Sequence, residues 1–160
     1  MSANKQVIEN FYKCFGKKDW QGMTACYHEE VFFYDPVFQD LEAPRARAMW
    51  EMLCKQAKDL SVEASNIEAD DEGYGSCNWT ATYTFSATGR KVVNNCTARF
   101  KFEEGKIIEH MDDFDLWKWS RQALGLKGTL LGWSPFVQNA IRKKAKKSLE
   151  KFMAQTAGYK

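Results

Sequence analysis

The spacing of apolar residues predicts a helical beginning for this chain. Over residues 2–17 the apolar side chains recur three and four positions apart, which is the period of an amphipathic helix. Asp19 can cap a second short helix, because an aspartate side chain accepts hydrogen bonds from the free N–H groups of a first helical turn. A short apolar strand then ends at Pro36, and Pro44 opens a third helix with a wide apolar stripe that runs toward residue 60.

After residue 60 the apolar period changes to two, which is typical of strands with one buried face. Short turns separate the alternating segments, and turns of this length join antiparallel neighbours. The segments cover 61–70, 76–87, 92–102 and 107–117. The expected fold class is therefore α+β, with the N-terminal helices packed on one face of a curved, largely antiparallel sheet.

The end of the chain differs from the rest in charge and in pattern. Glycines within 125–132 predict a loop, after which Ser134 and Pro135 provide the cap and the first residue of a final helix. Residues 134–160 carry seven basic side chains and one acidic one, whereas 1–133 carry sixteen and twenty. We expect one domain at 1–133 and an extra basic amphipathic helix at 134–160 that docks on it. A lid over a pocket and contact with an anionic membrane or a nucleic acid are the alternatives for this helix.

Composition narrows the class of protein. The chain has 160 residues, of which 44% are hydrophobic and 14% aromatic, enough for one domain with a bulky core or an apolar pocket. Its five cysteines are odd in number and show no paired spacing, which indicates free thiols and a cytoplasmic location. No segment has the length of an integral membrane span. No basic groove with interleaved aromatic residues indicates a nucleic-acid partner.

One segment combines titratable and apolar residues within a predicted strand. With period two, Ile108, His110, Asp112 and Phe114 share one face of this strand. An imidazole and a carboxylate between apolar neighbours are costly to bury unless they are paired or carry out chemistry. They mark a candidate catalytic site, and a hydrogen-bonded pair at the rim of the sheet is the alternative. No other His, Cys or Glu stands nearby at metal-ligand spacing, so no metal site is predicted.

The order of the elements and two short motifs resemble the nuclear transport factor two-like superfamily. The order helix–helix–strand–helix–meander is accompanied by a Tyr-Asp-Pro-Val motif at 34–37 and a Gly-Lys-Ile-Ile-Glu-His-Met-Asp motif at 105–112. The similarity covers about residues 4–119 and is greatest to the SnoaL-like and ketosteroid-isomerase-like branch. It implies a cone in which the helices and the concave sheet face enclose an apolar pocket, and a homodimer formed through the outer sheet face.

The resemblance also implies roles for individual residues. In the ketosteroid isomerases the aspartate of a similar motif is the general base, which implies this role for Asp35; a turn that begins at Asp-Pro is the alternative. Phe11 stands where the oxyanion tyrosine is expected, and 92–102 contain no acid for the second donor, so true ketosteroid isomerase activity is not expected. The SnoaL-like branch instead implies acid–base work by His110 and Asp112.

The function expected from this set is cofactor-independent acid–base catalysis on a small apolar, oxygen-bearing ring compound, such as a steroid-like or polyketide-like molecule. The reaction would be of the isomerase, cyclase or hydratase/hydrolase type. An epoxide-hydrolase set would need Arg99 to face inward, and the strand period places it outward. A non-catalytic binder of a small ligand and a protein-interaction module are the alternatives. The catalytic candidates are Asp35, His110 and Asp112, with no metal and no cofactor, and the expected pocket lining is Tyr34, Trp50, Trp79, Tyr83, Phe100 and Phe11.

Overall fold

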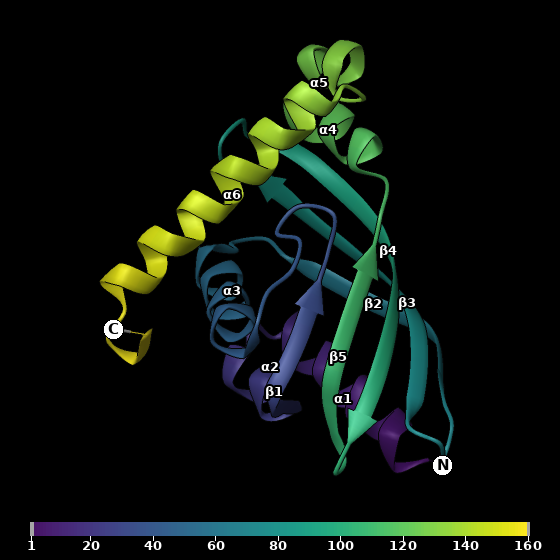
Figure 1. Ribbon diagram of the computed structural model, residues 1–160. Coiled ribbons are helices and arrows are strands. Elements are labelled where there is room, and N and C mark those ends of the chain that lie inside the picture. The colour runs from purple at the N-terminus through teal and green to yellow at the C-terminus, as the bar shows by residue number, and fades with distance from the viewer. Residues whose placement is uncertain (1, 160) are drawn as a thin grey trace.

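The computed structural model describes residues 2–159 and contains one sheet that curls around helices (Figure 1). The sheet has five strands in the order β1-β5-β4-β3-β2. The strands are β1 (Tyr27–Tyr34), β2 (Ser61–Ala69), β3 (Tyr74–Phe85), β4 (Arg90–Glu103) and β5 (Lys106–Asp113). Strands β2 to β5 form the antiparallel meander predicted from the alternating pattern. Strand β1 pairs in parallel with β5 and completes the sheet.

Three N-terminal helices pack on one face of this sheet: α1 (Ala3–Gly16), α2 (Trp20–Ala25) and α3 (Ala43–Gln56). The Asp19 side chain accepts a hydrogen bond from the N–H of Gly22 at 3.0 Å, as predicted for a cap of α2. The core lies between these helices and the sheet. Phe11 of α1 and Trp50 of α3 are buried there against inward-facing side chains of the strands. The α+β fold class with a curved sheet is thus confirmed.

The register of β5 differs from simple alternation. Phe102 pairs with Ile107, whereas Lys101 pairs with Glu109, so Ile108 is an extra residue without a partner on β4. Ile107 is therefore fully buried and Ile108 only half-buried. The expectation that Ile108 shares a face with His110 is wrong. Beyond the bulge the alternation resumes, and His110 faces the helices.

The segment after β5 is helical where the glycines predicted a loop. It contains α4 (Leu116–Leu124) and α5 (Leu126–Leu131), and β5 ends at Asp113 rather than extending to 117. Gly128 of α5 and Gly132, directly after this helix, lie so close to Ser120 of α4 that a Cβ at either position would overlap Ser120. These glycines therefore serve helix packing, which their sequence pattern does not distinguish from a loop.

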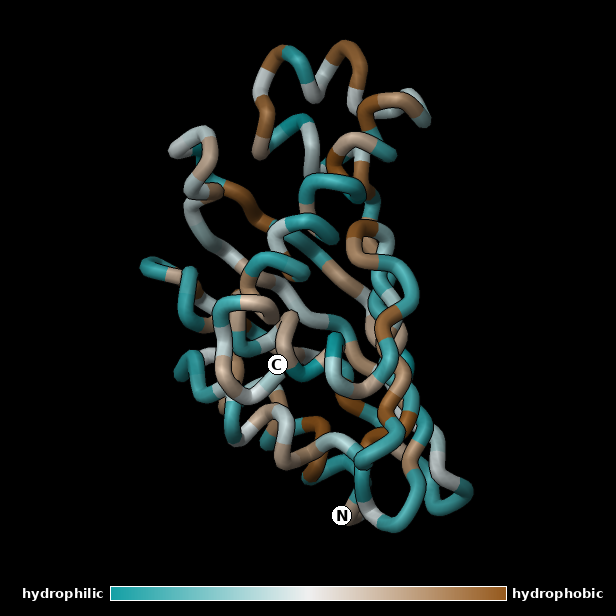
Figure 2. Tube along the Cα trace, turned by 60° about the vertical axis from the view of Figure 1, so that its left-hand side comes forward, coloured by the Kyte–Doolittle hydropathy of each residue, from teal (hydrophilic) through white to brown (hydrophobic). Residues whose placement is uncertain are grey.

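The long helix α6 (Pro135–Gln155) runs from α5 to α3, and a short 3₁₀ turn (Ala157–Tyr159) follows it (Figure 1). The Ser134 side chain caps α6 by accepting from the N–H of Val137 at 3.3 Å. Arg142 donates to the carbonyl oxygen of Pro36 at 2.9 Å, and Tyr159 donates to Glu51 of α3 at 3.0 Å. Figure 2 shows hydrophobic segments gathered at the end of the molecule formed by α5. Within 2–159, no helix is long and apolar enough to cross a membrane.

Candidate functional site

A chain of buried hydrogen bonds runs through the core beside β5. His110 Nδ1 lies 2.7 Å from Tyr27 Oη, and that hydroxyl accepts from Trp50 Nε1 at 2.8 Å. His110 Nε2 lies 2.9 Å from Asp112 Oδ1, which also accepts from Trp79 Nε1 at 3.1 Å. The helix α3 and three strands thus contribute to one continuous network.

The network determines where the proton of His110 sits. Tyr27 Oη accepts from Trp50, and His110 Nδ1 is its one other hydrogen-bond partner among residues 2–159, so the Tyr27 proton is donated to Nδ1. Nδ1 is then an acceptor, so the neutral imidazole carries its proton on Nε2 and donates it to Asp112. Burial raises the pKa of Tyr27 well above its usual value, which keeps the Tyr27 hydroxyl protonated and able to donate.

Aromatic rings enclose His110 on all sides that its hydrogen bonds leave free. The ring centroids of Phe11, Phe33 and Phe100 lie 5.3, 5.1 and 4.6 Å from that of the imidazole. Trp50 stacks on it at 6.1 Å. His110 has an exposed fraction of 0%, so not even a water-sized molecule touches it in this structure. What His110 can do from this position is hold the Asp112 carboxylate in one orientation.

Asp112 keeps one oxygen for other partners. Oδ1 accepts both hydrogen bonds described above, whereas Oδ2 accepts none from residues 2–159. Tyr12 Oη is the only wholly buried side-chain nitrogen or oxygen atom of residues 2–159 that has no hydrogen-bond partner. Because Asp112 Oδ2 also lacks a partner, it is not wholly buried and retains some accessible surface. Oδ2 is therefore the oxygen of this carboxylate that has no partner among residues 2–159, on a side chain that is 2% exposed.

Asp35 begins the turn after β1 and is half-buried. Its Oδ1 accepts from the backbone N–H groups of Val37 and Phe38 at 2.9 and 2.6 Å, so the residue does form the turn that Asp-Pro favours. Burial nevertheless raises the pKa of Asp35 to about 6, and the negative charge of Asp112 acts in the same direction. The carboxyl group can therefore gain or lose a proton near neutral pH.

Tyr83 of β3 lies at the same end of the core. Its hydroxyl accepts from Trp119 Nε1 of α4 at 2.8 Å, which leaves the Tyr83 proton free to be donated. Burial raises the pKa of Tyr83, and the charge of Asp35 contributes. Asp35, Asp112 and Tyr83 are thus linked electrostatically, although Asp35 comes from a turn and the other two from strands.

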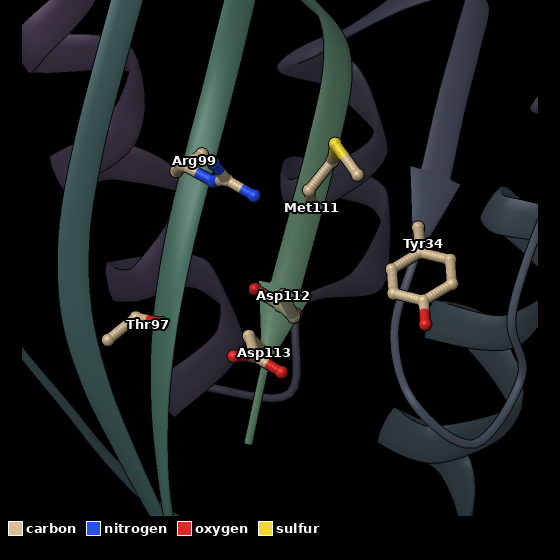
Figure 3. Close-up of a pocket in the computed structure, with 6 residues that line it drawn as sticks. All are labelled: Tyr34, Thr97, Arg99, Met111, Asp112 and Asp113. Atoms are coloured by element: carbon tan, nitrogen blue, oxygen red, sulfur yellow. The ribbon is translucent and has the colours of Figure 1, made fainter.

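Of the nine candidates from the sequence, the structure gathers six around the buried network: Phe11, Trp50, Trp79, Phe100, His110 and Asp112. Tyr34 does not join them. It helps to line a pocket of about 410 Å³ with Thr97, Arg99, Met111, Asp112 and Asp113 (Figure 3). Figure 3 shows Arg99 and Met111 on the side of the sheet away from the helices, so this pocket belongs to the outer sheet face.

Two residues that the sequence reasoning missed are tyrosines. Tyr27 completes the network, but nothing in the sequence indicates that β1 lies beside β5. Tyr12 follows Phe11 on the buried side of α1, and its hydroxyl is buried without a hydrogen-bond partner among residues 2–159. Burial, and next the charge of Asp112, raise the pKa of Tyr12 well above its usual value. Its place in the helical apolar stripe is the one signal that could have identified it.

Metal ligation finds no support in the part of the chain that the structure describes, since residues 2–159 contain no group of three His, Cys, Asp or Glu placed to hold an ion. All five cysteines are free thiols, and four of them are buried.

Comparison with known proteins defines the family. Residues 8–110 match the SnoaL-like domain, and the chain therefore belongs to the SnoaL-like domain family. No curated protein sequence matches it.

Solved structures share its fold at low sequence identity. A candidate polyketide cyclase from Xanthomonas campestris is 19% identical, with 76% of this chain and 96% of that chain covered and a TM-score of 0.64. An LEH-like epoxide hydrolase from Mycobacterium tuberculosis is 16% identical, with 80% and 92% covered and a TM-score of 0.64. A hypothetical protein with a ketosteroid isomerase-like fold from Catenulispora acidiphila, in complex with trimethylamine, is 8% identical, with 81% and 97% covered and a TM-score of 0.67. The predicted superfamily and its branch are thus confirmed.

Proposed function

We propose that this protein catalyses proton transfer, without a cofactor, on a small apolar ring compound that carries an oxygen. The observation that supports this most is the Asp35 carboxyl, whose pKa is raised to about 6 by burial, with the charge of Asp112 acting in the same direction. Pairs of carboxyl groups held in different environments are a recurrent basis of acid–base catalysis. The fold is also that of structures described as a polyketide cyclase and an epoxide hydrolase.

In the proposed reaction Asp35 is the general base. Its Oδ1 is committed to the turn, so Oδ2 would take a proton from a carbon next to the substrate carbonyl, or from a water molecule. The Tyr83 hydroxyl, which Trp119 leaves free to donate, would stabilise the oxygen on which negative charge develops. Asp112 would contact the substrate through Oδ2, and His110 would act as a positioning residue that fixes Asp112.

Exchange of substrate hydrogen for deuterium tests this proposal without knowledge of the natural substrate. A panel of apolar cyclic ketones is incubated with the protein in D₂O, and deuterium at the carbon next to the carbonyl is measured by NMR. We expect exchange with at least one member of the panel and a loss of about 10²–10⁴-fold for Asp35→Asn, which removes the base and keeps a similar shape. Asp71→Asn, at an exposed position between β2 and β3, is the matched control and should exchange like the parent.

Non-catalytic binding is the second candidate function, and one specific observation favours it. His110 has no exposed surface and all its polar atoms are paired, as in a purely structural hydrogen-bond network. A panel member that binds the parent and Asp35→Asn equally, with no exchange in either, would favour the binder and contradict the catalytic proposal.

We further propose a cytoplasmic homodimer that associates through the outer sheet face. The free thiols support the location. Two features support the interface. A second copy of the chain would fill the pocket of Figure 3 and would pack on the threonine-rich outer side of β3.

A further inference from the structure

The end of the molecule formed by α5 and the start of α6 carries apolar side chains that no other part of residues 2–159 covers. We call it the apolar tip; its members are Leu126, Leu130, Leu131, Trp133 and Phe136. The exposed fraction is 84% for Phe136 and 75% for Leu126. Figure 2 shows this end as a concentration of hydrophobic residues. In this conformation the side chains face solvent and do not close the cone as a lid.

The apolar tip is held in a defined shape. The close contact of Gly128 and Gly132 with Ser120 fixes α5 on α4. Trp117 Nε1 donates to the carbonyl oxygen of Thr129 at 3.3 Å, and Trp133 Nε1 donates to that of Leu130 at 2.9 Å. A rigid cluster of large exposed apolar side chains is unusual on a soluble surface and indicates a docking site.

The charged residues of the chain segment that carries the tip are all basic. Residues 116–149 contain eight lysines and arginines and no acidic residue. Lys127 lies within α5, between two members of the tip. Lys143 and Lys147 follow Phe136 by seven and eleven positions and so share its side of α6, and both are exposed. A partner surface must therefore accept apolar side chains and supply negative charge next to them.

We propose that the apolar tip docks on the surface of an anionic lipid bilayer. Leucine and phenylalanine side chains can enter the boundary between headgroups and acyl chains, where tryptophan is also favoured, while the lysines meet anionic headgroups. A second copy of this chain fits less well, because an isologous contact would bring each cation near its own counterpart. The docking is interfacial, and it would direct the cone toward a source of apolar compounds.

Vesicle sedimentation tests the proposal with the full chain. The protein is mixed with vesicles of phosphatidylcholine alone, or of phosphatidylcholine and phosphatidylglycerol at about 7:3, at low and high salt. We expect binding to the anionic vesicles alone, and a decrease of that binding as salt rises.

Two double variants examine the two parts of the surface. Leu130→Ser with Phe136→Ser should abolish binding, and Lys143→Glu with Lys147→Glu should weaken it by more than tenfold, since each lysine near an anionic surface contributes about fivefold. Their matched controls keep the chemical character of the same positions, Leu130→Met with Phe136→Leu and Lys143→Arg with Lys147→Arg, and should bind like the parent. Circular dichroism verifies that all four variants are folded.

Three results would overturn the proposal. The first is a parent protein that sediments with neither vesicle at millimolar lipid. The second is unchanged binding in both test variants. The third is a parent that self-associates without binding lipid and becomes monomeric in Leu130→Ser with Phe136→Ser, which would assign the tip to a second copy of the chain.

Discussion

The carboxyl group of Asp35 is subject to two opposing influences. The N–H groups of Val37 and Phe38 stabilise its charged form, whereas burial and the charge of Asp112 stabilise its neutral form. The pKa of about 6 means that burial is the larger influence. Asp35 thus adopts the turn that the sequence predicts, whereas its raised pKa is not predicted by the sequence.

This raised pKa predicts a pH-dependent stability. Below about pH 4 the Asp35 carboxyl is protonated in both the folded and the unfolded state; between about pH 4 and 6 only the unfolded state ionises, so stability is lost across this range and is level above it. The difference between 3.8 and about 6 corresponds to about 2–3 kcal/mol. This loss of stability should be absent in Asp35→Asn. Urea unfolding of the parent and the variant at pH 4.5 and 7.5 measures the difference. Equal pH profiles for the parent and Asp35→Asn would contradict the raised pKa.

Tyr27 is the central member of the buried network. Tyr27→Phe would leave both Trp50 Nε1 and His110 Nδ1 without their partner in the core. We expect a loss of about 1–3 kcal/mol in the free energy of unfolding, because each buried polar group would forfeit its hydrogen bond. Tyr74→Phe, at a tyrosine that is more than half exposed, is the control and should change the stability little. A neutral Tyr27→Phe would mean that the network is not held as described.

The sequence predicts part of this site, and the missing part has a physical cause. His110 and Asp112 stand two positions apart on one strand, so their proximity follows from the strand period alone. The partnership of His110 with Tyr27 depends on a parallel pairing of distant strands, which no local pattern encodes. The outward direction of Tyr34 likewise follows from its register opposite Met111.

At the scale of elements, amphipathic patterns were reliable wherever one face is buried. The α1 helix and the meander of β2 to β5 follow their apolar periods closely. Prediction failed at the bulge of β5 and at α5. An extra residue in a strand has no signature of its own, and glycines that permit close helix packing look like those of a loop.

The contact between α4 and α5 predicts that adding a single methyl group at Gly128 destabilises the fold. Gly128→Ala would place a methyl group onto the Ser120 carbonyl, so α5 must shift. We expect a loss of about 1–3 kcal/mol from overpacking, which lowers the Tm by about 2–4 °C per kcal/mol in a chain of this length. Gly158→Ala, where a Cβ meets open space, should be neutral in the same thermal scan. An unchanged Tm for Gly128→Ala would show that α5 is not packed on Ser120 in solution.

At the scale of the whole molecule, the outer sheet face makes a testable assembly. If two copies pair there, light scattering should return about twice the chain mass of 18.5 kDa, with more than about 1,000 Å² buried in total. Met111→Glu would place a charge in the pocket of Figure 3 and should shift the protein toward the monomer. Ala154→Glu, which adds the same charge at an exposed position of α6, is the control and should leave the mass unchanged. A mass of 18.5 kDa for the parent at micromolar concentration would exclude the dimer.

The parallel pairing of β1 with β5 also has a consequence for synthesis on the ribosome. Tyr27 pairs with Ile107, so about 80 further residues must be synthesised after β1 before its partner strand exists. At about 5–20 residues per second this takes about 4–16 s, during which a strand with an apolar side has an unpaired edge. The adjacent Glu29 and Glu30 on this strand are exposed, and charges on a strand edge discourage pairing with other chains. Their neutralisation should therefore lower the yield of folded protein during translation while leaving the finished fold as stable as before.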